Sequence, residues 1–319
     1  MSVEKNGYLQ DVLKTHRMAH VKELIEKFQS KRKEVKEAFE ENFGTKIYSP
    51  INSGSYAKHT AINSKFDLDI VVPFKRDSFE SLEKMFCDVC YFLQEKYGTI
   101  ATVRRQKVSI GVQFYADGEG DIIDLDIVPG REFNQGQYEE DKNINLFVDS
   151  TYGFIEEKTW IQTNIQRQID HIKAKDNERK IIRLLKIWKN CNCEKYKSFL
   201  LELITIKAFE EIDISGNLWE KLKAVMEYIK DNVAKEGFKL TDPGNSNNNV
   251  IDTLTLVERA NFSNRMNILL CNICQNKENI KQYFPLNKDF EDELPSNNSY
   301  GIKGATVASS IPKNNQRFG

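Results

Sequence analysis

The sequence predicts an α+β protein of two lobes, in which a lobe built around a mixed sheet precedes a helical lobe. The chain has 319 residues, more than the usual size of a single domain. Helix and strand patterns alternate over the first 130 residues, whereas the patterns after residue 150 are mostly helical. We therefore expect a first lobe over 1–150, a helical lobe over 151–291 and a flexible tail over 292–319.

The first lobe is predicted to begin with helices and to continue with strands. Apolar residues spaced three and four apart predict one long helix over 8–43, continuous or broken, and another from Phe79 to Tyr97. Strand and turn residues fill 47–75 between them. Residues Val103–Phe114 read as a half-buried strand, and Asp121–Pro129 alternates acids with apolar residues as a further strand.

The second lobe is predicted to consist of helices joined by polar loops. The turn-rich segment 241–249 is expected to be a loop between two of them, and the Ser-, Asn- and Gly-rich end from Asp292 reads as a tail. The expected helices are Thr159–Ala174, Asn177–Asn190, Ser198–Glu211, Leu218–Glu236 and Thr253–Asn276.

Charge and hydropathy exclude two classes of protein. The 46 Lys and Arg residues nearly cancel the 47 Asp and Glu residues, which argues against a protein that holds long nucleic acid. The N-terminus lacks an apolar signal segment, and no run approaches a membrane span. We therefore expect a cytoplasmic protein.

Six cysteines include two C-x-x-C pairs, Cys87 with Cys90 and Cys271 with Cys274. Such pairs can hold zinc, but both lie in apolar stretches of helical period and not in Gly-rich knuckles. We expect buried, reduced thiols.

Acidic residues at the edge of a strand carry the first functional signal. Asp67 and Asp69 lie two residues apart, so on a strand both carboxylates point to one side. Hard oxygen ligands of this kind suit Mg²⁺. The strand 121–128 offers Asp121, Asp124 and Asp126 as a third carboxylate, and the pattern alone leaves the choice open.

A Gly-Ser pair precedes these acids. Gly54 lets the backbone approach phosphate oxygens, and Ser55 adds a hydroxyl and an N–H where a short helix, Tyr56 to Ile62, is expected to begin. Either feature alone is commonly a plain turn or strand edge. Their joint order, Gly-Ser, short helix and D-x-D before an apolar strand, predicts nucleoside triphosphate handling at a two-metal site.

The order of these motifs resembles the polymerase-β-type nucleotidyltransferases, and more narrowly the oligoadenylate synthetases and the bacterial CD-NTases. "LDIVPG" (125–130) matches the family strand that carries the third metal carboxylate, which selects Asp126. In the second lobe "IIRLLKIWKN" (181–190), "YKSFLLELITIKAFEE" (196–211) and "TDPGNSNNNV" (241–250) are similar to family segments. The resemblance covers roughly 45–275.

The resemblance implies a cyclic di- or trinucleotide synthase of the bacterial cytoplasm that acts in CBASS antiphage defence through a downstream effector. Two Mg²⁺ ions, or Mn²⁺, would be held by Asp67, Asp69 and Asp126, and the substrates would be ATP, GTP or pyrimidine NTPs. Lys186 matches a lysine that reaches the triphosphate, although its place on the polar face of a helix reads equally as solvated. Ser198 matches a position near the same phosphates.

Two other functions stay open. A linear transferase, of the oligoadenylate type or acting on RNA or protein without a template, would share this site, but the near-zero charge gives no hint of an RNA platform. A catalytically dead scaffold would only bind nucleotides or a partner, and three intact carboxylates argue against it.

The tail ends in Gly319 after a polar stretch. On composition it reads as a disordered end. Some bacterial CD-NTases, however, are joined to cellular targets through their C-terminal residue by a ubiquitin-ligase-like protein, and a terminal glycine offers no side chain to obstruct that chemistry. We therefore expect Gly319 to be a conjugation point for such a partner.

Overall fold

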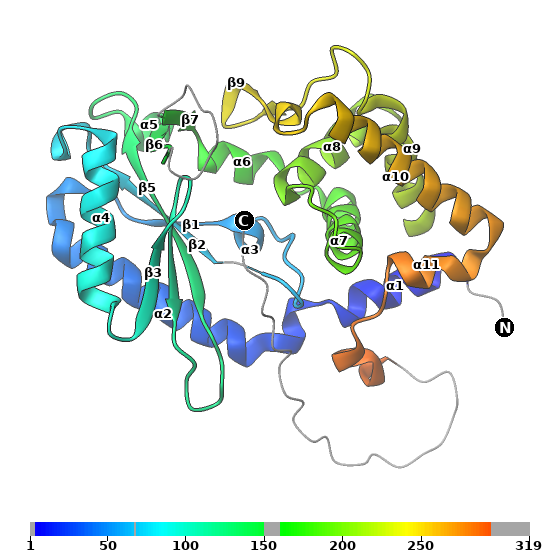
Figure 1. Ribbon diagram of the computed structural model, residues 1–319, viewed down its shortest axis with the longest axis horizontal. Coiled ribbons are helices and arrows are strands. Elements are labelled where there is room, and N and C mark those ends of the chain that lie inside the picture. Colours follow the sequence, from blue (N-terminus) through cyan, green and yellow to red (C-terminus); the bar gives the residue numbers. More distant parts are fainter. Residues whose placement is uncertain (1–3, 67, 150–159, 295–319) are drawn as a thin grey trace.

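A computed structural model describes residues 4–66, 68–149 and 160–294, and it confirms the predicted α+β class. Figure 1 shows a sheet with its covering helices on one side of the molecule and a group of helices on the other. Asp67 and the tail from 295 to Gly319 lie outside the described residues.

Helices and strands alternate in the first part of the chain, as the sequence predicts. The predicted long N-terminal helix is broken at Thr15 and resumes at Lys22 after a short turn. The second predicted helix begins at Leu82 because the Ser81 side chain caps it. The elements are α1 (Lys5–Thr15), α2 (Lys22–Phe43), β1 (Ile51–Ser53), α3 (Gly54–Ala57), β2 (Asp69–Phe74), α4 (Leu82–Tyr97), β3 (Ala101–Arg105), β4 (Ile110–Phe114), β5 (Asp124–Glu132), α5 (Tyr138–Asp141), β6 (Ile144–Phe147) and β7 (Trp160–Thr163).

The rest of the described chain is mostly helical. One helix spans the predicted Ser198–Glu211, and the helices that follow it begin at the capping boxes of Asn217 and Thr255. The elements are α6 (Ile165–His171), α7 (Asp176–Cys191), α8 (Ser198–Glu211), α9 (Leu218–Asn232), β8 (Thr241–Asp242), β9 (Asn245–Asn249), α10 (Leu256–Gln275) and α11 (Ile280–Tyr283).

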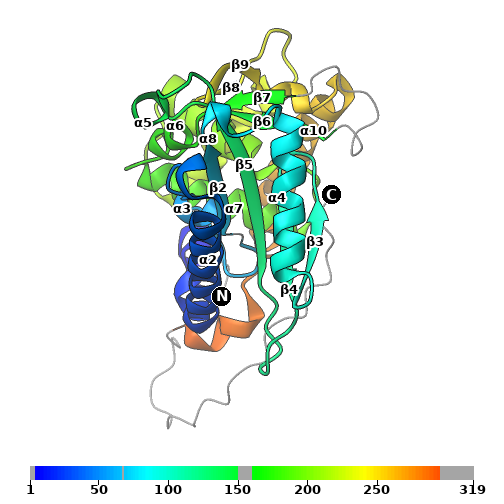
Figure 2. The ribbon, with the colours of Figure 1, turned by 90° about the vertical axis from the view of Figure 1, so that its left-hand side faces the viewer.

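The main sheet is mixed. Its strands follow the order β1-β2-β5-β4-β3, β6 pairs with the far end of β5, and β7 pairs with β6. Strands β2 and β5 run parallel, and the other pairs are antiparallel. Helices α2 and α4 pack on one face of this sheet (Figure 2). The opposite face is left for the functional residues.

Three sequence predictions are wrong. Val103–Phe114 is two antiparallel strands, β3 and β4, because the chain turns back between Arg105 and Ile110. Thr159–Ala174 is not one helix: residues 160–163 pair with β6, and the Asn164 side chain then caps α6. The expected loop 241–249 contains the short hairpin of β8 and β9.

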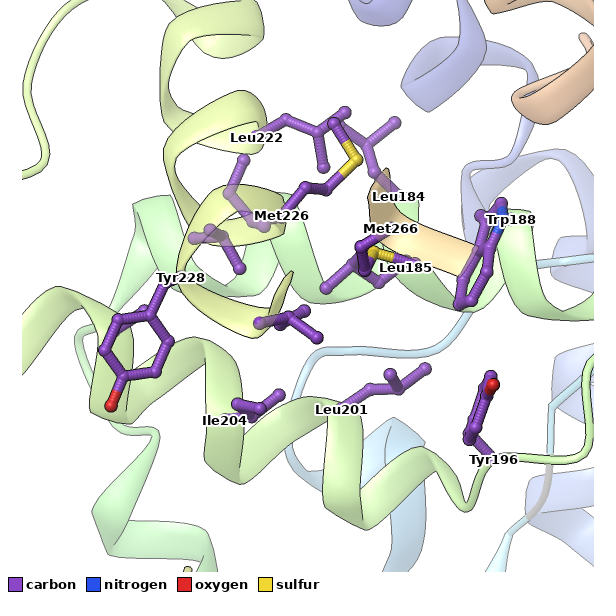
Figure 3. Packing of buried hydrophobic residues seen from close by; sticks show 14 of the residues in the cluster. Leu184, Leu185, Trp188, Tyr196, Leu201, Ile204, Leu222, Met226, Tyr228 and Met266 are labelled. Carbon is purple, nitrogen blue, oxygen red and sulfur yellow. The ribbon is translucent and has the colours of Figure 1, made fainter. Parts of the chain in front are cut away.

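Two apolar cores hold the fold together. The first lies between the sheet, α2 and α4. The second joins the helices, with the predicted apolar stripe of α7 at its centre: Leu184, Leu185 and Trp188 meet side chains of α8, α9 and α10 (Figure 3). Helix α1 contributes Leu9 and Val12 to this helical core, although it comes first in the chain. The domain boundaries near 150 and 292 stay predictions.

No helix in the described part of the chain is long and apolar enough to cross a membrane.

Candidate active site

Two of the predicted carboxylates lie side by side on the sheet. Strands β2 and β5 are parallel neighbours with Ile70 opposite Ile127, and both isoleucines are buried in the core. Asp69 and Asp126 each come directly before one of these residues. Since side chains alternate along a strand, both carboxylates project from the face away from α2 and α4. Both are partly exposed, and this pair is the centre of the candidate site.

The Gly-Ser turn reaches the same edge of the sheet. Ser53, the last residue of β1, pairs with Asp69, so Gly54 and Ser55 follow directly beside the carboxylate. Gly54 has a φ of 77°, a conformation that favours glycine. The helix expected over 56–62 is instead the four-residue α3, which begins at Gly54; His59 then takes a left-handed conformation with a φ of 56°.

Asp126 is oriented by its neighbours on the β3–β4 hairpin. Gln106 Nε2 donates a hydrogen bond to Asp126 Oδ1 at 2.9 Å, and Ser109 Oγ donates to Gln106 Oε1 at 2.7 Å. Gly111 lies directly opposite Asp126 on β4, and a Cβ there would lie 2.7 Å from Gln106 Nε2. The missing side chain therefore leaves room for the glutamine. Sequence reasoning missed Gln106 because residues 106–109 read as strand.

The other two acids of this segment have different surroundings. Asp124 Oδ2 accepts hydrogen bonds from Gln113 Nε2 at 3.0 Å and Arg104 Nη2 at 3.4 Å, and burial raises the pKa of its carboxyl. Asp121 lies before β5 and binds the ammonium group of Lys27. Asp126 is the neighbour of Asp69 across strands β2 and β5, and neither Asp121 nor Asp124 takes that position.

Lys186 is buried, contrary to its expected place on the polar face of its helix. Only 6% of the residue is exposed, and its Nζ donates hydrogen bonds to Thr60 Oγ1 at 2.9 Å and to the Thr60 carbonyl oxygen at 3.1 Å. The Thr60 N–H donates in turn to the Ser55 carbonyl oxygen at 2.9 Å. Lys186 therefore lies against the segment that closes the Gly-Ser turn, and α3 lies between the sheet and α7 (Figure 1).

Ser198 is the first residue of α8. Its Oγ accepts a hydrogen bond from Lys189 Nζ at 2.9 Å, and no contact recorded for the described residues joins it to the two carboxylates.

A buried ion pair fastens the Gly-Ser turn to the helical lobe. Lys58, the residue after α3, places its Nζ 2.8 Å from Glu202 Oε1 of α8 and 4.6 Å from the ring centre of Phe199. Lys58 is 8% exposed and Glu202 only 3%. Sequence reasoning missed this pair, because the two residues are 144 positions apart.

Basic side chains of α7 gather next to His59, which follows α3 and Lys58. A cavity of about 340 Å³ is lined by His59 together with Arg179 and Arg183 of α7. Burial, Arg17 and Arg179 lower the pKa of the Arg183 guanidinium. Asp176, which lies 3.4 Å from Arg179, and Lys180 also line the cavity. The three basic side chains outnumber the one acid, so the cavity suits anions, whereas the sequence suggested a solvated face.

A second group of acids already binds a lysine. Asp117, Glu119 and Asp121 could together hold a metal ion, but Lys27 Nζ lies between them, 2.7 Å from Asp117 Oδ2. The lysine ammonium therefore occupies the position that a metal ion would take between these carboxylates.

All six cysteines are free thiols. Cys87 and Cys90 are partly buried, but Cys191, Cys193, Cys271 and Cys274 are exposed. The expectation of buried thiols is wrong for these four.

No protein-family model matches the chain. Over 232 residues, the chain is 25% identical to the cyclic AMP-AMP-AMP synthase of Escherichia coli strain MS 115-1, with 68% of each protein covered.

Solved structures resemble the chain over most of its length. The structure of the E. coli MS115-1 CdnC:HORMA-deltaN complex matches with a TM-score of 0.63 and 22% identity, over 81% of this chain and 90% of that one. CdnC of the same strain, solved with ATP, matches with a TM-score of 0.63 and 20% identity, over 86% and 96%. The chain therefore shares its fold with CdnC, and this fold and the sequence relationship are in keeping with the resemblance to the bacterial CD-NTases.

Proposed function

We propose that the protein synthesises a cyclic di- or trinucleotide from nucleoside triphosphates at the pair Asp69 and Asp126, with Asp67 as the third carboxylate. The observation that carries the proposal is the pairing of β2 with β5, which sets both acids on one face beside Gly54 and Ser55. The sequence relative in E. coli is a cyclic AMP-AMP-AMP synthase, and its counterpart CdnC was solved with ATP, which supports NTPs as substrates.

The donor set fits divalent cations. Two partly exposed carboxylates on neighbouring strands offer hard oxygen ligands, which Mg²⁺ and Mn²⁺ prefer, and substrate phosphates commonly complete such sites. Asp67, Asp69 and Asp126 would hold the ions. Bound there, they would neutralise charge on the triphosphate and make the attacking ribose hydroxyl more acidic.

The chain's own groups would perform the remaining steps. Gly54 and Ser55 would present backbone N–H groups and a hydroxyl to the triphosphate, close to the carboxylates. Asp126, held at one oxygen by Gln106, would accept the proton of the attacking hydroxyl. Pyrophosphate then leaves as the new phosphodiester forms, and repetition within the same pocket closes the ring.

The triphosphate would be held from the helical lobe by basic groups near Thr60. Lys186 supports the turn through Thr60, and a direct contact with phosphate requires its release from that residue. Arg179 and Arg183 line the neighbouring cavity and supply further positive charge. Ser198 would join them once Lys189 no longer binds its hydroxyl.

The product would act as a signal. We place it in CBASS antiphage defence, where a downstream effector would recognise it. CdnC was solved in complex with HORMA-deltaN, which supports a protein partner for this chain as well. The conjugation of Gly319 by a ubiquitin-ligase-like protein is a separate proposal.

The test is an incubation with radiolabelled NTPs and Mg²⁺, followed by phosphatase. Phosphatase-resistant cyclic products are expected, and the Asp126→Ala variant should make none. Linear products that carry terminal phosphates would show a templateless transferase instead, and the absence of any product from the wild-type chain would contradict enzymatic activity.

A further inference from the structure

A second cavity, of about 550 Å³, lies at the far end of the sheet from the candidate active site. Its volume is in the range of small-molecule sites. Among its lining residues are Arg76, Arg131, Asn145 and Trp160, from the ends of β5, β6 and β7 and the turn after β2.

This cavity is on the opposite face of the sheet from the carboxylates. Arg131 follows Asp126 by five residues on β5, an odd number, so their side chains project to opposite faces about 16 Å apart along the strand. Arg131 pairs with Asn145 of β6, which therefore shares its face. Trp160 of β7 pairs with Phe147, which packs against Phe86 of α4 on this same face. Figure 2 shows the end of β5 beside β6 and β7, with α4 next to them.

The cavity carries positive charge, and no acid among the described residues lines it. Arg76 and Arg131 both line it, none of its lining residues is acidic, and neither arginine forms an ion pair within the described ranges. Burial and the nearby charge of Arg76 lower the pKa of the Arg131 guanidinium. Glu132, the adjacent acid, instead accepts hydrogen bonds from the Tyr48 hydroxyl and from two backbone N–H groups.

The arginines are held in place but not saturated. Arg76 Nη1 donates to the Phe133 carbonyl oxygen at 2.5 Å, and Arg131 Nη1 donates to the Phe79 carbonyl oxygen at 3.2 Å. Arg131 Nε is buried without a hydrogen-bond partner among residues 4–66, 68–149 and 160–294. Fixed guanidinium groups with donors to spare favour planar recognition of phosphate.

Two further side chains restrict the ligand. Asn145 is 8% exposed, and its Oδ1 is buried without a hydrogen-bond partner in the described chain, so it can accept from a ligand donor. Trp160 is 48% exposed at the cavity and offers an aromatic surface.

We propose that this cavity binds a small molecule that carries a phosphate group on an aromatic ring. The phosphate binds Arg76 and Arg131, a donor group of the ligand binds Asn145, and the ring packs on Trp160. This site is independent of the proposed catalytic function, because it uses none of the same residues.

Calorimetric titration of the full chain with phenyl phosphate tests the proposal. We expect one binding site, at least tenfold weaker binding in Arg131→Gln and in Arg76→Gln, and a smaller loss in Arg131→Lys. Phenol, which lacks the phosphate, should bind at least tenfold more weakly. Phenyl phosphate should quench tryptophan fluorescence in the wild-type chain, and this quenching should be absent in Trp160→Phe. Arg265→Gln, an exposed arginine of α10 that pairs with Glu194, is the matched control and should bind like wild type.

The Asp126→Ala variant separates this cavity from the active site and should bind phenyl phosphate with unchanged affinity, whether or not the protein is an enzyme. Loss of binding in that variant would overturn the proposal, because the ligand would then occupy the active site. Wild-type affinity in both Arg76→Gln and Arg131→Gln, equal binding of phenol, or no binding at millimolar phenyl phosphate would also overturn it. Melting curves identify any variant that fails to fold. If Arg131→Gln fails to fold, the affinity of Arg76→Gln decides the test.

Discussion

The buried pair of Lys58 and Glu202 predicts a large loss of stability when only one partner is changed. The Lys58 side chain is 10% exposed and that of Glu202 4%, so Glu202→Gln leaves a buried ammonium without its counter-charge. Removal of one partner of such a pair typically costs about 3–5 kcal/mol. For 319 residues, an unfolding entropy of about 2.1 cal/mol/K per residue gives about 0.67 kcal/mol/K in total, and hence a melting temperature lower by about 4–7 °C.

Scanning calorimetry measures this shift. The matched control is Glu37→Gln, because Glu37 is 62% exposed and lies 3.6 Å from Lys33, so its loss should cost less than about 1 kcal/mol. Replacement of both partners, Lys58→Met with Glu202→Leu, should recover most of the stability, since no buried charge remains. A Glu202→Gln melting temperature within about 1 °C of the control would refute the reasoning.

Three further predictions concern the carboxylates and a buried histidine. Asp126→Ala should lower turnover by about 1,000-fold or more and Asp124→Ala by less than about 10-fold, with the reverse order in a product assay contradicting the choice of Asp126. Gln106→Ala should lower kcat by about 10-fold with an unchanged KM for NTP and melting temperature, as measured by initial rates; an unchanged kcat would remove Gln106 from the site. Burial lowers the pKa of His16, whose neutral ring donates a hydrogen bond to the Val12 carbonyl oxygen at 2.9 Å. The stability that this neutral histidine contributes is therefore present above its ordinary pKa of 6.5 and is lost as the pH falls below 6.5. His16→Gln should therefore show a smaller fall in melting temperature than wild type between about pH 7.5 and 5.5, and an equal fall would show that other groups cause it.

Local patterns were sufficient to predict the face of the sheet from which the acids project, but the choice of Asp126 over Asp124 needed the family resemblance. Alternation places Leu68, Ile70, Leu125 and Ile127 in the core, which turns the intervening acids to the other face whatever the strand order. The helix Ser198–Glu211 was predicted to the residue, and eight of its side chains are buried.

Contacts between distant parts of the chain could not be predicted in this way. Lys186 lies in a helix with an evident polar face, and its buried contact with Thr60, 126 positions away, could not be read from that pattern. The turn between β3 and β4 contains no glycine or proline between Arg105 and Ile110, so the two strands read as one and Gln106 was missed. A single sequence shows neither which strands pair nor which distant segments meet, and these contacts decide the two cases.

The central claim is that Asp69 and Asp126 form the catalytic centre of a cyclic oligonucleotide synthase. The most direct measurement is the initial rate of phosphatase-resistant product formation by Asp69→Asn, with the melting curve recorded on the same preparation. The account predicts an unchanged melting temperature and a rate lower by about 1,000-fold, because a metal-ligating charge is lost while the shape is kept. A correctly folded Asp69→Asn protein that forms cyclic product at a rate near that of wild type would contradict it.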